Sequence, residues 1–386
     1  MILVFIDNKL GTIDTVLPIL LEMKERYGVR SYIVLSGALA NAGIKKNVVI
    51  NDAIAKVGSK VYIGRGFDNR FARLFVSFLQ IQRLFLFSLL GAKIIHFGAL
   101  NHGLLHFIFR IFDKNIFLCQ SLAFEYTGHE KKRDDIVRTN NMFTGQSIIA
   151  TNNLMPELQS KKNINKKKYL FGPTRMRKIW LEHSYYLAEY YLKKYHPNIN
   201  YKDGYVVIIL YTFGKVDVFD DNQTSERLFR ETLDMIIELY PNKAILIKPH
   251  VATQLDILNK IIDQSKSDKI EITYLHPGVL SRFADMFICN TYSNTLADAF
   301  SLGVTTIEYT NYKKYILSRT KNKSFGYQFL NYFINNNKVL FKKVLKDIEG
   351  RKPSKNTPLL DGVLIDDDSG LLESLNSHNK CNFTCN

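Results

Sequence analysis

The chain has 386 residues, more than one hydrophobic core usually organises, so we expect two domains. Hydrophobic residues make up 46% of the sequence and charged residues 23%, which excludes wholesale disorder because enough apolar surface can be buried to offset the ordering entropy. Lysine and arginine number 52 against 36 acidic residues, and the resulting net charge of +16 favours polyanionic partners such as nucleic acid, anionic lipid or phosphorylated substrates.

The cysteines show no disulfide framework, because two of the four lie inside apolar runs and the other two lie among the last six residues. Cys381 and Cys385, preceded by His378, are one ligand short of a structural zinc site. We therefore expect a reducing compartment. Residues 1–7 have neither a basic leader nor a small-residue cleavage site, so we interpret them as a first strand rather than a signal peptide.

The first half of the chain alternates short apolar runs with segments of helical spacing. A polar turn over residues 7–12, which contains Gly11, separates the first predicted strand from a helix over 13–27. The predicted strands are 2–6, 31–35, 60–63, 93–96 and 115–119. Apolar strands that alternate with amphipathic helices predict a parallel sheet with helices on both faces.

The second half repeats this pattern and predicts a second α/β domain. Its predicted strands are 205–211, 244–248, 270–274, 286–289 and 305–309, and its predicted helices are 224–240, 254–265 and 295–302. The sequence thus predicts an N-terminal domain over 1–160, a basic interdomain linker over 161–202, a C-terminal domain over 203–350 and a polar, poorly ordered tail over 351–386.

Two basic stretches allow two interpretations each. Residues 161–178 hold eight lysines and arginines and no acid, which is typical of a solvated loop, or of a contact for phosphates or a membrane surface. Residues 69–112 hold nine of the 26 phenylalanines, five lysines and arginines, and no acid. A basic stripe from Arg70 to Arg83 runs along a Phe-rich helix there, which is either a core helix or a helix lying on an anionic bilayer.

Two segments of the second half carry the strongest indication of chemistry. A predicted strand ends in Lys248-Pro249-His250, at the carboxyl edge where open α/β sheets bind ligands. Residues 290–294 (Asn-Thr-Tyr-Ser-Asn) stand between a strand and a helix, where hydroxyls and free backbone N–H groups make an anion site. Asn294 is also a good N-cap residue, and Asp298 follows one turn later, so both could equally serve the helix start alone.

This pair of segments resembles the C-terminal domain of GT-B glycosyltransferases that build bacterial surface polymers, namely the CDP-glycerol glycerophosphotransferases, the capsular Kdo transferases and the bacterial sialyltransferases. Lys248-Pro249-His250 matches their His-Pro element in reversed order, unless His276-Pro277 is the equivalent. Tyr292-Ser293-Asn294 and Asp298 match their Tyr-Ser-Ser and trailing Asp, and Gly303-Val304 lacks the usual Pro. The resemblance covers about residues 205–315, and the first domain resembles the family in its architecture and its Gly11 loop.

The resemblance implies an α/β protein with two Rossmann-like domains facing a cleft (GT-B), the first on the acceptor side and the second binding the nucleotide donor. The implied activity is transfer of a sugar, with a CMP-linked acidic sugar favoured, to a bacterial surface glycan such as lipopolysaccharide or capsule. The implied donor-binding residues are Gly11, Lys248, His250, His276, Asn290, Tyr292, Ser293, Asn294 and Asp298. We expect no cofactor besides the nucleotide sugar and no catalytic metal, because cationic side chains and helix N-termini can neutralise the departing phosphate.

Retaining GT-B enzymes often place two glutamates eight positions apart in this part of the second domain. Here Asn290 and Asp298 stand at that spacing. The missing acid pair favours inversion, in which a base from the first domain deprotonates the acceptor hydroxyl. The candidates for that base are Asp7, Asp14, Glu125 and His129. Glu125 follows a predicted strand end, and its alternative is a surface loop; for Asp14 the alternative is a favourable charge at a helix N-terminus.

Two other functions stay open: a non-hydrolysing sugar-nucleotide epimerase, whose paired acids we do not find, and a basic nucleic-acid-binding protein, for which the basic residues lack interleaved aromatics. The expected partners are a nucleotide-activated sugar, a glycan or lipid-linked acceptor and an anionic membrane surface, with no nucleic acid. The expected location is cytoplasmic and peripheral on the inner membrane.

Overall fold

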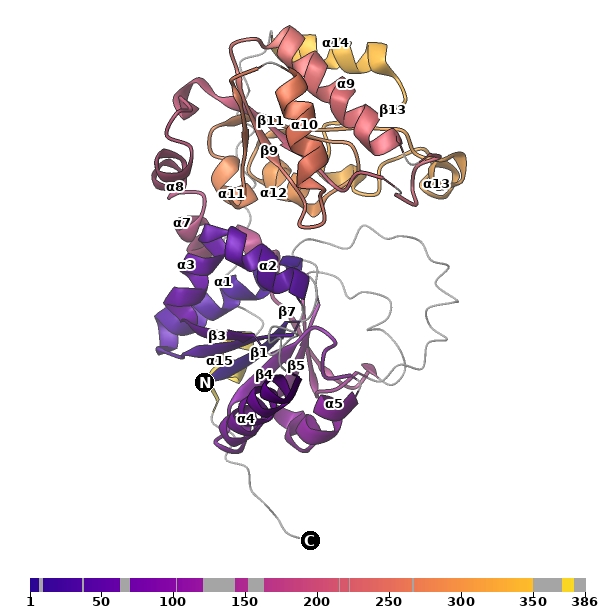
Figure 1. The fold of residues 1–386 in the computed structure, drawn as a ribbon. Helices are drawn as coiled ribbons and strands as arrows, with labels where there is room; N and C mark the ends of the chain where they lie inside the picture. The colour runs from indigo at the N-terminus through magenta and orange to yellow at the C-terminus, as the bar shows by residue number, and fades with distance from the viewer. Residues whose placement is uncertain are drawn as a thin grey trace. The chain divides into compact units, whose positions relative to one another are not determined.

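The structure is a computed structural model that describes residues 1–6, 10–36, 38–62, 70–101, 103–120, 143–151, 163–214, 216–221, 223–265, 267–349 and 370–377. The chain divides into two compact units (Figure 1). The first unit holds the described residues up to Trp180 together with a C-terminal helix, and the second holds the described residues from Leu181 to Glu349.

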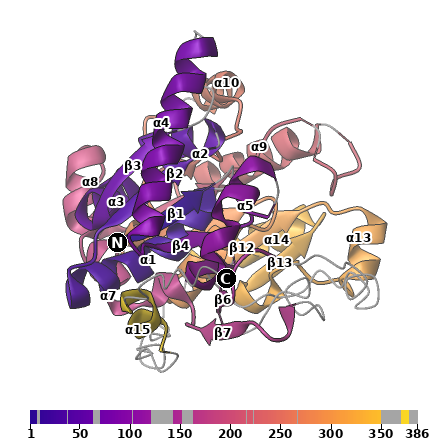
Figure 2. The ribbon, with the colours of Figure 1, turned by 90° about the horizontal axis from the view of Figure 1, so that it is seen from below.

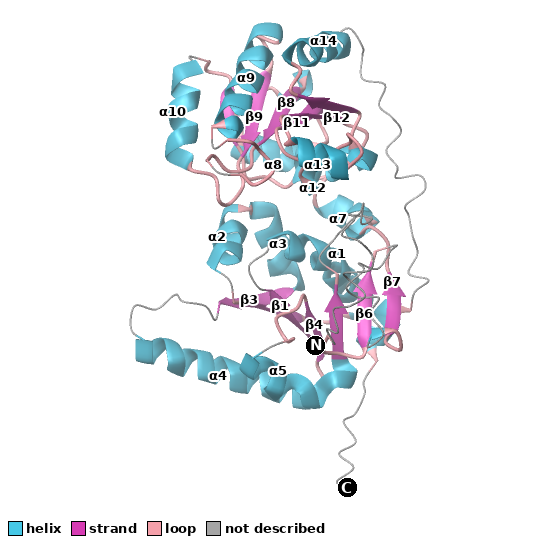
Figure 3. Cartoon of the chain, turned by 90° about the vertical axis from the view of Figure 1, so that its right-hand side faces the viewer, coloured by secondary structure: helices cyan, strands magenta, loops and turns pink. Residues whose placement is uncertain are grey.

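The first unit is built on a seven-stranded sheet in the order β3-β2-β1-β4-β5-β6-β7, with every neighbouring pair parallel. Its strands are β1 (Ile2–Ile6), β2 (Ser31–Leu35), β3 (Gly58–Tyr62), β4 (Lys93–His96), β5 (Ile116–Cys119), β6 (Ser147–Ala150) and β7 (Lys167–Leu170). Helices lie on both faces of this sheet (Figure 3). They are α1 (Leu10–Tyr27), α2 (Ala38–Lys46), α3 (Val48–Val57), α4 (Arg70–Leu89), α5 (Gly103–Phe109) with the 3-10 helix η1 (Arg110–Asn115), and α15 (Leu371–Asn376).

Alternation along β1 shows why both faces are covered. Ile2, Val4 and Ile6 pack into one core with α1, α3 and α15, whereas Leu3 and Phe5 pack into another with α4, α5 and η1. Successive side chains of a strand point to opposite faces, so a strand that is apolar at every position needs helices on each side. All five residues of β1 are buried.

The second unit repeats the architecture with a six-stranded parallel sheet in the order β10-β9-β8-β11-β12-β13. Its strands are β8 (Tyr205–Ile209), β9 (Ala244–Lys248), β10 (Ile270–Ile272), β11 (Ala284–Cys289), β12 (Thr305–Thr310) and β13 (Tyr332–Asn335). Its helices are α8 (Ala188–Tyr195), α9 (Thr224–Leu239), α10 (Leu255–Ser265), α11 (Pro277–Leu280), α12 (Asn294–Ser301), α13 (Lys314–Arg319) and α14 (Lys338–Glu349), and α7 (Lys178–His183) precedes them. The predicted α/β class with two doubly wound parallel sheets is confirmed.

The strand order fixes where each sheet can hold a ligand. In the second sheet the chain runs outward from β8 through β9 to β10 on one side, and from β11 through β12 to β13 on the other, so the switch point lies between β8 and β11. In the first sheet the same reversal falls between β1 and β4. Crevices outside the carboxyl ends of the strands at such points are the ligand sites of open α/β sheets.

Part of the segment predicted to be a basic linker belongs to the first unit instead. Lys167–Leu170 forms the edge strand β7, which pairs with β6. After it, the 3-10 helix η4 (Thr174–Met176) and the next residue bring two arginines to buried acids on α1: Arg175 lies 3.9 Å from Asp14, and Arg177 pairs with Glu22. These charges are therefore paired inside a domain rather than solvated.

The predicted polar tail also contains an ordered, packed element. In α15 the side chains of Leu371, Leu372 and Leu375 are buried in the core of the first unit. The hydroxyl of Tyr169 on β7 donates a 2.7 Å hydrogen bond to Ser374 of this helix. The expectation of a poorly ordered tail is wrong for α15, because its three leucines share one helical face and bury it.

Candidate functional site

Three segments meet at the carboxyl edge of the second sheet, at its switch point: residues 210–214 after β8, 248–250 at the end of β9 and 290–293 after β11. Neighbouring parallel strands end at the same edge, so these segments lie next to one another within this unit. Two of the three segments are those that the sequence analysis selected.

His250 is exposed at this edge. Its Nδ1 accepts a 3.2 Å hydrogen bond from the Ala252 N–H, and its ring lies 5.2 Å from the ring of Tyr211. Burial of part of the ring, and next the charge of Lys248, lower the pKa of His250. A neutral imidazole that accepts at Nδ1 carries its proton on Nε2, so His250 offers a ligand one N–H donor.

The Lys248 and His276 side chains are engaged in the second unit itself. The Lys248 Nζ donates a 2.8 Å hydrogen bond to the carbonyl of Leu275. His276 is almost fully buried at the start of α11, where its Nδ1 accepts a 3.0 Å hydrogen bond from the Gly278 N–H. Of the two histidines that resemble the His-Pro element, His250 is the one that faces solvent.

The helix α12 begins at the second polar segment. Ser293, not Asn294, is its N-cap: the Ser293 Oγ accepts a 3.3 Å hydrogen bond from the Thr295 N–H. Asn294 is the first helical residue and is exposed. The predicted anion-binding turn therefore does open a helix, whose N-terminus carries a partial positive charge suited to a phosphate.

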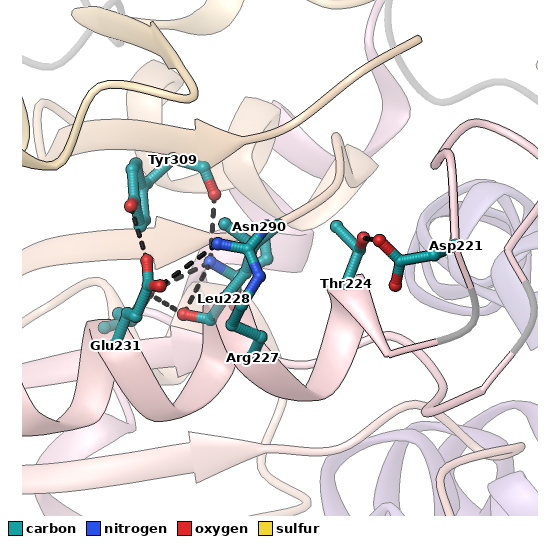
Figure 4. A network of polar contacts seen from close by, with 8 residues as sticks. Asp221, Thr224, Arg227, Leu228, Glu231, Asn290 and Tyr309 are labelled. Atoms are coloured by element: carbon teal, nitrogen blue, oxygen red, sulfur yellow. Dashed lines mark hydrogen bonds and ion pairs between the residues drawn. The ribbon is translucent and has the colours of Figure 1, made fainter.

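Asn290 and Asp298 lie beneath this surface rather than on it. The Asn290 Nδ2 donates to the carbonyl of Tyr309 at 2.9 Å and to the Thr232 hydroxyl at 3.0 Å, with the Leu228 carbonyl at 3.5 Å. Figure 4 shows the Asn290 side chain directed toward α9 and β12. Asp298 is fully buried within α12. Asn290 thus anchors the end of β11 to its neighbouring elements.

A buried acid on β12, Glu308, supports the 290–293 segment. It is absent from the predicted site residues. Its carboxylate accepts hydrogen bonds from the hydroxyls of Tyr312 and Ser324. The Tyr312 hydroxyl in turn accepts a 3.1 Å hydrogen bond from the Tyr292 N–H. A Cβ added to Gly326 would overlap the Tyr292 ring, so this glycine also fixes the loop. A glutamate inside a predicted strand, 305–309, was the signal that could have found it.

The third segment is the turn after β8, which is also absent from the predicted site residues. Gln254 ties this turn to the start of α10, because its Oε1 accepts 3.0 Å hydrogen bonds from both the Thr212 hydroxyl and the Phe213 N–H. Gly214 follows with a φ of +84°, a conformation that favours glycine. A glycine a few residues after an apolar strand is a turn signal that can be recognised in the sequence.

The first-unit candidates have different outcomes. Asp14 is buried on α1, and its carboxylate lies 3.9 Å from the guanidinium of Arg175. Gly11 lies in the first turn of α1 rather than in a loop before it. The remaining candidates Asp7, Glu125 and His129 lie outside the described residues. Within the described part of the chain, no three His, Cys, Asp or Glu side chains are grouped as metal ligands.

Comparison with protein-family models and with curated protein sequences finds no match. Solved structures do match over nearly the whole chain. The complex of Arabidopsis thaliana UGT89C1 with UDP is 9% identical, covers 97% of each chain and has a TM-score of 0.53. Os79 from O. sativa in complex with UDP is 11% identical, covers 98% of this chain and 100% of its own, and has a TM-score of 0.52.

The UDP-GlcNAc 2-epimerase from Neisseria meningitidis bound to UDP-GlcNAc is 10% identical, covers 97% of this chain and 98% of its own, and has a TM-score of 0.50. At these identities the likeness concerns the fold. The protein has two doubly wound parallel sheets, and its fold is the two-domain α/β fold of the GT-B class.

We predict that replacing both Ser293 and Asn294 with alanine weakens nucleotide binding. The change removes a hydroxyl and an amide from the start of α12, and with them the cap, so a modest stability loss of about 1 kcal/mol should accompany it. Titration calorimetry with UDP and CMP measures the affinity. Asn47→Ala is the matched control, since Asn47 caps α3 in the same way through the Ile50 N–H. Equal affinities in the double variant and the wild type would remove α12 from the site.

Proposed function

We propose that the protein is a glycosyltransferase that moves a sugar from a nucleotide-activated donor to an acceptor hydroxyl, with its donor site at the switch point of the second sheet. The observation that carries the proposal is the meeting, at one sheet edge, of the exposed His250 and the N-terminus of α12. A neutral N–H donor and a helix N-terminus both stabilise the charge that develops on a departing phosphate.

The donor nucleotide has two sources of support that differ. The sequence resemblance favours a CMP-linked acidic sugar, whereas two solved structures with the same fold are complexes with UDP. Binding and hydrolysis assays with CMP-, CDP-, UDP- and GDP-activated sugars test the function directly. Turnover of one donor only in the presence of a glycan acceptor supports transfer. Interconversion of the sugar within its nucleotide, without an acceptor, would instead identify a sugar-nucleotide epimerase.

We further propose that the reaction inverts the anomeric carbon without a metal and that a first-domain carboxylate, Glu125 or Asp14, is the acceptor base. Retaining GT-B enzymes often hold two glutamates at the spacing of Asn290 and Asp298, and both of these residues are buried here. Asp14 is already paired with Arg175 inside the first unit, which favours Glu125 as the base. NMR coupling constants of the product decide the stereochemistry, and a retained configuration would contradict this part of the proposal.

We predict that His250→Ala lowers kcat/KM for the donor by about one to two orders of magnitude. One hydrogen bond to a charged group is worth about 1.5–3 kcal/mol, and the Nε2–H of His250 is placed to make it. Steady-state kinetics with the identified donor measures the loss. His106→Ala serves as the control, because His106 contacts Leu100 and Thr144 inside the first unit. Full turnover in His250→Ala would contradict this role of His250.

For the acceptor and location, we propose a bacterial surface glycan or its lipid-linked precursor, handled by a cytoplasmic protein at the inner face of the membrane. No helix among the described residues is both long and apolar enough to cross a bilayer. Two features support a peripheral position: residues 69–112 are rich in phenylalanine and lack acids, and the chain has a net charge of +16.

A further inference from the structure

Between residues 78 and 90, where its side chains are described, the outward face of α4 and of the residue after it is largely apolar, although a surface helix is usually charged there. Its exposed residues with described side chains, together with the residue after it, are Phe78, Leu79, Gln82, Arg83, Leu86 and Leu90. The exposed fraction is 58% for Leu86 and 82% for Leu90. The opposite face of the helix holds Leu84, which is fully buried in the core of the first unit. The described part of the helix therefore has a core face and, opposite it, apolar side chains that are exposed to solvent.

The adjoining α5–η1 segment has the same property. Phe107 is 78% exposed and Ile111 is 65% exposed, whereas Phe109 and Phe112 are buried. The two helical segments pack against each other through Phe85 of α4 and Phe112, whose ring centroids are 5.3 Å apart. Both segments lie on the same side of the sheet in Figure 3 and face the viewer in Figure 2. Their outward residues therefore form one surface, the α4–α5 face.

The charges on the α4–α5 face have one sign. Its exposed ionic side chains are Arg83, Arg110 and Lys114. The one acid between residues 78 and 115, Asp113, is half-buried and accepts hydrogen bonds from the Gly145 N–H and the Gln146 side chain, so its carboxylate is turned to the protein. Exposed Phe, Leu and Ile flanked by cations and lacking exposed carboxylates form the pattern of an interfacial helix on anionic lipid.

We propose that the α4–α5 face docks on an anionic lipid bilayer, with Leu86, Leu90, Phe107 and Ile111 entering the headgroup boundary and Arg83, Arg110 and Lys114 contacting lipid phosphates. The inference rests on the proposed function in one respect, since docking brings a transferase to a membrane-held acceptor. Lipid fits better than a protein partner because the cations flank an apolar strip that is continuous over two helices. A bilayer accepts such a strip without shape complementarity, at a depth of about 5–10 Å.

Co-sedimentation of the full chain with vesicles tests this proposal. One set of vesicles is pure phosphatidylcholine, and the other contains equal parts of phosphatidylcholine and phosphatidylglycerol. The apolar variant combines Leu86→Gln, Leu90→Gln, Phe107→Gln and Ile111→Gln, and all four sites are exposed, so folding should be unaffected. The charge variant combines Arg110→Gln with Lys114→Gln. The matched control, Val339→Gln with Leu340→Gln, removes exposed apolar side chains from α14 in the second unit.

We expect the wild type and the control to sediment with the anionic vesicles, and binding to weaken as salt rises. The charge variant should lose about fivefold in partition coefficient for each cation removed, and the apolar variant should lose at least about tenfold. Equal sedimentation of the apolar variant and the wild type, or no binding of the wild type, would overturn the proposal. So would a dimer seen by ultracentrifugation that only the apolar variant dissociates, since a second copy would then cover the face.

Calorimetry with UDP and CMP on the same variants keeps the two proposals apart. The α4–α5 face belongs to the first unit and the nucleotide site to the second, so nucleotide affinity should be unchanged by the apolar variant. Vesicle binding without nucleotide binding would contradict the proposed function and leave the docking face standing. The reverse result would contradict the docking face alone.

Discussion

Replacing Glu22 with alanine is expected to lower the free energy of unfolding of the first unit by about 3–5 kcal/mol. Glu22 on α1 accepts hydrogen bonds from the Nε of Arg177 and, at 2.9 Å, from its Nη2. The side chains are 5% exposed for Arg177 and 8% for Glu22, so the variant leaves a buried guanidinium without its carboxylate. Urea unfolding followed by the fluorescence of Trp180, the one tryptophan of the sequence, measures the loss in this core.

Two control variants distinguish the effect of breaking the buried ion pair from the effect of removing any charge. The double variant Glu22→Met with Arg177→Met removes both charges and fills the space, and it should recover most of the lost stability. Lys193→Ala breaks the exposed pair with Glu189, and it should leave the unfolding curve unchanged. An equal loss in the single and double variants would mean that helix packing, not the ion pair, holds the segment after β7 to α1.

The alternation of strands and helices was predictable because β1 and β8, which lie inside the two sheets, have hydrophobic residues at every position. Residues 205–209, for example, are all buried in β8, and the sequence predicts this strand directly. The edge strand β7 was missed because only Tyr169 of its four residues is buried and two of the others are lysines. Edge strands carry such charges to avoid pairing with other chains, so their sequences resemble loops.

The location of the site was predictable to the level of a sheet edge, but not the direction of each side chain. Asn290 stands in the predicted turn, yet its amide points back to α9 because it is the residue directly after β11 and binds the Tyr309 carbonyl. Likewise, the cap of α12 is one residue earlier than expected, and such shifts at helix ends depend on dihedral angles rather than on composition. The ion pairs of Arg175 and Arg177 were not predictable either, because their acid partners on α1 are distant in sequence.

The second large effect is expected in the pH dependence of stability of the second unit. Burial raises the pKa of Glu308 to about 7 from its ordinary value of 4.5, although its hydrogen bonds with Ser324 and Tyr312 oppose the shift. A carboxyl whose pKa is raised on folding stabilises the folded state fully below pH 4.5, and this contribution is lost as the pH rises through 7. The difference corresponds to about 3 kcal/mol over this range.

Glu308→Gln should therefore flatten the stability profile between pH 4.5 and 7, whereas the wild type should lose stability as the pH rises. The neighbouring groups do not titrate in this window, because burial raises the pKa of Cys289 on β11 and that of Tyr312. Urea unfolding combined with amide hydrogen exchange of β12 peptides, corrected for intrinsic exchange rates, measures both profiles. Parallel profiles would show that Glu308 keeps an ordinary pKa. If the profiles diverge as expected, the 290–293 segment, which reaches Glu308 through the Tyr292 N–H and the Tyr312 hydroxyl, depends on a carboxyl that is protonated below neutral pH.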